Sequence, residues 1–113
     1  RRHTRSFHVT GVQTCALPIY SKDLKLPHMG WNEVNIIKKN DLFLDIKNLS
    51  HFYFVHSYTF EVENINDIIC KTDYDQPLVV ALLKDNIFGT QFHPEKSQDN
   101  GIKLLSNFLN WKL

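Results

Sequence analysis

Residues 78–83 read Leu-Val-Val-Ala-Leu-Leu, an apolar run in which no polar side chain alternates with the apolar ones. A strand with one face in water shows such alternation, so a short run without it indicates a strand that is buried on both faces. The polar stretch at residues 84–86 suits a tight turn, after which residues 87–92 return as the next strand. Both faces of this sheet must therefore be covered by other parts of the fold.

The rest of the pattern supplies strands and helices for such a layered fold. Residues 52–58 are dense in aromatic and β-branched side chains, which favours a strand. An amphipathic helix over residues 98–111, with Ser97 as its N-cap, is indicated by apolar residues at helical spacing: Ile102, Leu105, Phe108 and Leu109. The other predicted elements are an extended segment at 26–34, a short helix at 41–47 capped by Asn40 or Asp41, a strand or strand extension at 59–62, and a strand at 68–72. We predict the α/β class, with a mixed sheet and flanking helices.

Residues 1–19 differ in composition from the rest of the chain. They hold all three arginines and no lysine, aspartate or glutamate, whereas residues 20–113 hold ten lysines and no arginine. The run at residues 9–19 resembles a translated sequencing-adapter oligonucleotide. A basic, acid-free N-terminus also occurs in transit peptides, but this one has no clear amphipathic repeat. We therefore predict that residues 1–19 are a non-native, disordered head and that residues 20–113 are the domain.

Net charge and hydropathy argue against nucleic acid and membrane as binding partners. The net charge of +1 gives no reason to expect nucleic acid, and no apolar run approaches the roughly 20 residues that span a membrane. Two cysteines are too few for a disulfide scaffold. Cys70 suits a buried small apolar residue, and a catalytic Cys15 would need a positioned base and a strained turn that its surroundings do not show. We expect a cytoplasmic protein that binds neither nucleic acid nor membrane.

The side chains best suited to catalysis lie where the strand at residues 87–92 ends, in the sequence His93-Pro94-Glu95. Pro94 has no N–H and ends the strand ladder, so Glu95 follows just outside the sheet. A histidine at the carboxyl end of a strand lies where open α/β folds place their ligands. A carboxylate beside it can hold the imidazole tautomer and stabilise the imidazolium. The pattern is that of a base and its orienting carboxylate.

Two other interpretations of this segment stay open on the residues alone. His93 can be a solvated histidine with Glu95 paired to Lys96. A metal site would need His93, Glu95 and His56 as ligands, and no Cys/His cluster supports it. We expect no metal and no cofactor.

The run Gly-x-Gln-Phe-His-Pro-Glu at residues 89–95 resembles the C-terminal motif of class I glutamine amidotransferases. In that family a Cys-His-Glu triad hydrolyses glutamine to glutamate and ammonia. The resemblance implies that His93 is the base and Glu95 the orienting carboxylate.

Three further stretches resemble one branch of this family, the glutaminase of imidazole glycerol phosphate synthase. They are Pro-His-Met-Gly-Trp-Asn-Glu-Val at 27–34, Tyr-Phe-Val-His-Ser-Tyr at 53–58, and Lys-Ser at 96–97. The resemblance implies a glutamine pocket lined by residues 56–58, namely His56, Ser57 and Tyr58. It also implies that Trp31, Asn32 and Lys96 contact a (β/α)8-barrel synthase (cyclase) subunit in a heterodimer. A purely structural role, as a packed or solvated side chain, stays open for Trp31, His56, Tyr58 and Lys96.

The family's nucleophile lies in a Gly-x-Cys-x-Gly elbow, and no such sequence occurs in these 113 residues. The resemblance therefore implies the C-terminal half of a class I glutamine amidotransferase domain. Removing a triad nucleophile costs on the order of a million-fold in rate, so we expect this chain to be inert by itself. Two alternatives remain: a non-catalytic interaction module, and a glutaminase paralogue that feeds the amidation of surface sugars.

Overall fold

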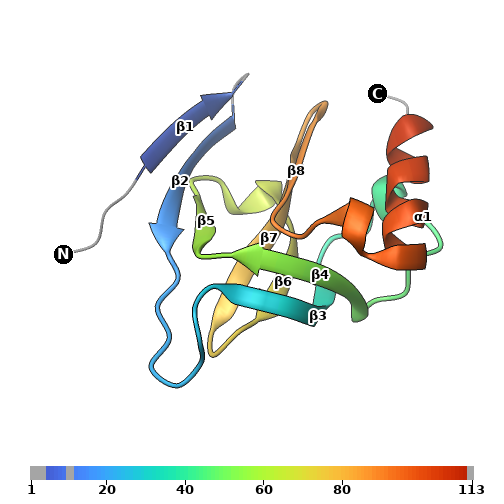
Figure 1. The fold of residues 1–113 in the computed structure, drawn as a ribbon. Coiled ribbons are helices and arrows are strands. Elements are labelled where there is room, and N and C mark those ends of the chain that lie inside the picture. Colours follow the sequence, from blue (N-terminus) through green and yellow to red (C-terminus); the bar gives the residue numbers. More distant parts are fainter. Residues whose placement is uncertain (1–4, 10–11, 112–113) are drawn as a thin grey trace.

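The computed structural model describes residues 5–9 and 12–111, with side chains from residue 17 onward. An eight-stranded sheet is flanked by one α-helix and three 3-10 turns (Figure 1). The elements in chain order are β1 (Arg5–Val9), β2 (Val12–Pro18), β3 (His28–Ile36), η1 (Asp41–Phe43), β4 (Ser50–His56), β5 (Tyr58–Val62), η2 (Ile65–Asp67), β6 (Ile68–Asp73), β7 (Pro77–Lys84), β8 (Ile87–Thr90), η3 (Pro94–Lys96) and α1 (Gln98–Leu109).

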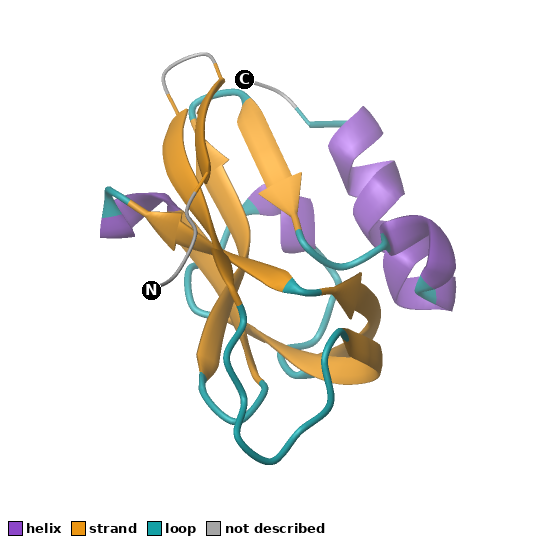
Figure 2. Ribbon diagram, turned by 60° about the vertical axis from the view of Figure 1, so that its left-hand side comes forward, coloured by secondary structure: helices purple, strands orange, loops and turns teal. Residues whose placement is uncertain are grey.

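The sheet is strongly curled (Figure 2). The strand order is β1-β2-β5-β7-β6-β3-β4, β8 also pairs with β7, and all these pairings are antiparallel. Just beyond β8, Phe92 forms a bridge to Phe54 of β4. The carboxyl end of β8 is thereby fixed beside β4.

The core lies inside this curl and beneath α1. Val80, Ala81 and Leu82 are consecutive and all buried, which confirms that β7 is covered on both faces. On β4 the buried side chains are Phe52 and Phe54, two residues apart as expected for one face of a strand. Both aromatic rings contact Phe92. The prediction of the α/β class is confirmed, whereas the sheet of the described residues is antiparallel and not mixed as predicted.

The helix predicted at 98–111 is confirmed as α1, although its buried face is not the predicted stripe, whereas the helix predicted at 41–47 is not formed. The segment at 41–47 forms only the 3-10 turn η1, with the Asn40 side chain accepting a hydrogen bond from the N–H of Leu42. Asp45 then takes a positive φ of 63°, which an α-helix does not allow. In α1 the buried residues are Gly101 and Leu104, whereas Ile102, Leu105, Phe108 and Leu109 are exposed. The apolar residues that we expected to face the core therefore lie outside it.

The described residues of the N-terminal segment pair with the sheet. β1 pairs with β2, and β2 pairs with β5. Leu17 and Ile19 are buried, and the N–H of Ile19 donates to the carbonyl of Ser57 at 2.8 Å. That the head is non-native, with the domain beginning at residue 20, stays a prediction. Residues 1–4 and 10–11, on which this prediction also falls, lie outside the described part.

Of the helices in the described part of the chain, none has the length and apolar character needed to cross a bilayer.

Candidate active site

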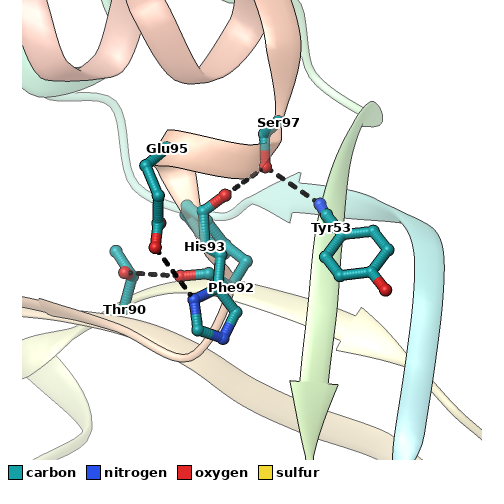
Figure 3. A network of polar contacts seen from close by, with 6 residues as sticks. All are labelled: Tyr53, Thr90, Phe92, His93, Glu95 and Ser97. Carbon is teal, nitrogen blue, oxygen red and sulfur yellow. Dashed lines mark hydrogen bonds and ion pairs between the residues drawn. The ribbon is translucent and has the colours of Figure 1, made fainter.

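His93 is held at the carboxyl end of β8 by its own backbone (Figure 3). Its N–H donates to the carbonyl of Tyr53 on β4 at 2.9 Å, directly after the Phe54–Phe92 bridge. Pro94 then begins η3, for which His93 is the N-cap residue. The chain turns out of the sheet at this point, as the position of Pro94 in the sequence predicted.

Ser97 ties the same turn to β4 through its hydroxyl. Its Oγ donates to the carbonyl of His93 at 2.6 Å and accepts from the N–H of Tyr53 at 3.0 Å (Figure 3). The residue is buried, so both bonds are shielded from water. We predicted Ser97 as the N-cap of α1, and it occupies that position without a side-chain capping bond. The hydroxyl serves the His93 turn instead, a role that the sequence reasoning missed.

Glu95 projects from η3 toward the imidazole of His93. Its Oε2 lies 3.3 Å from His93 Nδ1 (Figure 3), and the two side chains are 61% and 38% exposed. The pKa of Glu95 is lowered, first by a hydrogen bond from its own backbone and then by the His93 side chain. The contact has the expected base-and-carboxylate geometry, and the catalytic roles of both residues stay predictions.

The three pocket residues predicted from the resemblance lie at the corner between β4 and β5. His56 ends β4 and Tyr58 begins β5, with Ser57 at the bend between them. Burial and the charge of His93 lower the pKa of His56, against the opposing effect of its hydrogen bond to the Tyr58 carbonyl. Ser57 and Tyr58 are exposed, although the Ser57 carbonyl accepts from Ile19.

His28 is a second residue that the sequence reasoning missed. It lies directly opposite His56 in the β3–β4 pairing, and its Nδ1 is 2.8 Å from His56 Nε2. Only 3% of its surface is exposed, and the ring stacks on Phe54. Burial, and then the charge of His56, lower the pKa of His28 to about 4. The pairing register could have revealed this contact, but the long connection between the two strands hides that register in the sequence.

The residues predicted to contact a partner do not share one face. Trp31 points outward from β3 and is 47% exposed, and Lys96 is exposed on η3. Asn32, one residue along, faces inward, and its amide lies against His28 and the backbone of Asp73. Because successive side chains of a strand point to opposite faces, Asn32 and Trp31 lie on opposite faces of β3. The partner contact of Asn32 stays a prediction.

The described residues offer neither an activated cysteine nor a metal site beside His93 and Glu95. Cys70 is buried in β6, and burial raises the pKa of its thiol, which disfavours the nucleophilic thiolate. In the part of the chain that the structure describes, no three His, Cys, Asp or Glu side chains are grouped to hold a metal ion. The described arrangement offers an imidazole base with a carboxylate partner.

The buried His28 makes stability depend on pH. Its folded pKa of about 4 lies below the unfolded value of 6.5, so the unfolded chain takes up the proton first. Stability is complete above pH 6.5 and falls as the pH approaches 4, by about 3 kcal/mol from this residue. Urea unfolding across this window measures the loss, and the shift of His56 acts in the same direction.

A His28→Phe variant is the matched control for this loss, because phenylalanine keeps a ring in the stack but cannot titrate. Its stability should change much less between pH 6.5 and 4 than that of the unmodified chain. Because the pKa of Glu95 is lowered in the folded protein, its protonation reduces stability mainly below pH 4.5, at the acidic end of the window. Equal pH dependence in both proteins would contradict the prediction.

A family model described as glutamine amidotransferase class-I matches residues 7–111. The match covers the His93-Pro94-Glu95 turn, both strands of the β3–β4 pair, and much of the N-terminal hairpin.

Several curated relatives carry the name imidazole glycerol phosphate synthase subunit HisH. That of Pelagibacter ubique (strain HTCC1062) is 56% identical over 86 residues, which are 76% of this chain and 41% of the relative. That of Azospirillum brasilense is 48% identical over 90 residues, 80% of this chain and 47% of the relative. That of Neisseria meningitidis serogroup B (strain MC58) is 52% identical over 88 residues, 78% and 42% of the two chains. The matched part of the chain spans less than half the length of these relatives.

Proposed function

The chain belongs to the class-I glutamine amidotransferase family, and from this premise we propose that it supplies the base and orienting carboxylate for the hydrolysis of glutamine. The observation that carries the proposal is the contact of His93 Nδ1 with Glu95 Oε2 at 3.3 Å, at the carboxyl end of β8. Because Nδ1 meets the carboxylate, Nε2 is the nitrogen left to exchange a proton with a nucleophile.

The proposed chemistry needs a cysteine from the N-terminal half of the family domain. His93 Nε2 takes the thiol proton, and the thiolate sulfur attacks the carboxamide carbon of glutamine. When the C–N bond breaks, the proton passes from His93 to the departing ammonia, leaving a thioester. Water, deprotonated by the same imidazole, then cleaves the thioester to glutamate and regenerates the thiol. The steps balance without a metal, an oxidant or a cofactor.

The curated relatives support a specific branch of the family. Their name, imidazole glycerol phosphate synthase subunit HisH, describes one subunit of a larger enzyme. We propose that the parent protein delivers ammonia to the synthase (cyclase) subunit in histidine biosynthesis, in the cytoplasm. The alternative paralogue, which would feed the amidation of surface sugars, differs in the subunit that accepts the ammonia.

The outward face of the β3–β4 pair is the proposed contact with that synthase subunit, a (β/α)8 barrel. Met29, Trp31 and Val55 are all exposed there, with Met29 opposite Val55 in the pairing register. Next to them lies a hollow of about 620 Å³, lined by Trp31, His51, Ser97, Gln98, Asp99, Asn100 and Lys103. Apolar side chains beside a polar rim are typical of protein interfaces. Lys96 on η3 belongs to this proposal, and so does Asn32, which lines a separate hollow on the opposite face of β3.

The test uses a restored polypeptide, in which the N-terminal half of the Pelagibacter relative is joined to residues 20–113. We expect glutaminase activity from the restored polypeptide together with the synthase subunit of the same source, and none from the 113-residue chain. A version without the elbow cysteine is the control, since it keeps the fold and loses the nucleophile. An inactive restored polypeptide that still binds the synthase subunit would favour the non-catalytic interaction module.

A further inference from the structure

Four polar groups form one continuous chain of hydrogen bonds across β3, β4 and the start of β5. Asn32 Nδ2 lies 3.2 Å from His28 Nε2, and His28 Nδ1 lies 2.8 Å from His56 Nε2. His56 Nδ1 lies 2.8 Å from the carbonyl oxygen of Tyr58. This series of hydrogen bonds is anchored at its other end, because Asn32 Nδ2 also donates to the carbonyl of Asp73 at 2.9 Å.

The direction of every bond in this series can be assigned by starting from its last acceptor. The Tyr58 carbonyl can only accept, so His56 carries its proton on Nδ1. His56 Nε2 is then an acceptor, which requires His28 to donate from Nδ1. His28 Nε2 is an acceptor in turn and receives an N–H of the Asn32 amide. In their neutral state both imidazoles therefore carry the proton on Nδ1.

Packing and hydrogen bonds hold the His28 ring in one orientation. It is packed between Phe54 and Tyr74, with ring centroids 4.7 and 4.2 Å away. The Asn32 amide is itself oriented, because its Oδ1 accepts the N–H of Glu33 at 2.8 Å. Burial lowers the pKa of both histidines, which keeps them neutral near pH 7. A flipped ring would leave buried donors and acceptors unpaired, at a cost of about 1–3 kcal/mol for each.

We propose that His28, oriented by Asn32, is a positioning residue that fixes the tautomer of His56 and thereby the backbone at Ser57 and Tyr58, the corner assigned above to glutamine binding. This inference rests on the proposed function. His56 spans the corner by joining the end of β4 to the first carbonyl of β5. If Nδ1 loses its proton, the Tyr58 carbonyl loses its donor and the corner is free to move.

This role predicts a particular pattern in the kinetics. His93 is held through Tyr53 and Ser97, and none of those bonds involves His28. Loss of His28 should therefore raise the KM for glutamine on the order of tenfold, the equivalent of one hydrogen bond, and leave kcat close to its original value.

The experiment compares two substitutions of His28 in the restored polypeptide. His28→Phe keeps a ring in the stack and removes both nitrogens, so it should give a mixture of His56 tautomers and the higher KM. His28→Asn keeps an N–H near the position of Nδ1, so it should retain the Nδ1–H tautomer and most of the original KM. Two-bond ¹⁵N–¹H spectra of the histidine rings report the tautomer, and steady-state kinetics with the synthase subunit report KM and kcat.

Ile65→Ala is the control, because Ile65 is exposed on η2 and its side chain takes no part in this series of hydrogen bonds. It should change neither the spectrum of His56 nor the KM. The proposal is overturned if His56 keeps one tautomer in His28→Phe, if its proton lies on Nε2 in the unmodified protein, or if the tautomer changes without a change in KM. It is also overturned if kcat falls in proportion to the rise in KM. A restored polypeptide without glutaminase activity refutes the proposed function, while the His56 spectra still decide whether His28 sets the tautomer.

Discussion

Replacing His93 by alanine in the restored polypeptide should lower kcat for glutamine hydrolysis by at least about a thousandfold. The imidazole is the one described group at the end of β8 that has both a carboxylate partner and a backbone held on two sides. Without it, nothing takes the thiol proton or returns it to the departing ammonia. Steady-state kinetics with the synthase subunit present measure the loss.

Two further variants serve as comparisons for the loss of kcat in His93→Ala. Glu95→Gln should cost less than His93→Ala, because Glu95 is exposed and acts only by orienting the base. Cys70→Ala should leave turnover unchanged, because the Cys70 thiol is buried in β6. Turnover that survives His93→Ala, or that collapses with Cys70→Ala, would refute the assignment of roles.

The second large effect concerns Gly101, in the first turn of α1. A Cβ added at this position would lie 1.8 Å from the carbonyl oxygen of Pro94 and 3.1 Å from Cβ of Ser97. The nearest atoms belong to the backbone of η3, so relief requires α1 or η3 to move. We expect Gly101→Ala to lower the free energy of unfolding by about 3 kcal/mol or more, and to weaken activity because η3 carries Glu95. Urea unfolding of the restored polypeptide measures the first effect.

Gly89→Ala supplies the matched control. It adds the same methyl group in β8, where the nearest atom is Leu82 Cδ1 at an ordinary 3.8 Å. Its unfolding midpoint should stay close to that of the unmodified protein. If the two alanine variants unfold at the same urea concentration, the close approach of α1 to Pro94 does not matter for stability.

Much of the fold is readable in the sequence where a pattern is local. The unbroken apolar run of β7 shows its burial on both faces, and the polar turn after it predicts the return of β8. Pro94 marks the end of the ladder, and the spacing of His93 and Glu95 predicts their contact. Each of these features depends on residues that are close together in the chain.

The parts that the sequence reasoning missed depend on long-range packing. The helix predicted at 41–47 fails after one turn, because Asp45 adopts a left-handed backbone that local propensity does not foresee. The exposed apolar residues of α1 show that helical spacing locates a stripe without showing what covers it. The His28–His56 contact required the strand register, and the bridging hydroxyl of Ser97 required the position of β4.

The Ser97 bridge has a consequence for thermal motion. Tyr53, to which it ties the His93 turn, lies on the same strand that ends at His56. The base and the proposed pocket thus share β4 as a common frame. When the curled sheet flexes, the two are carried along together, so their separation should stay nearly constant.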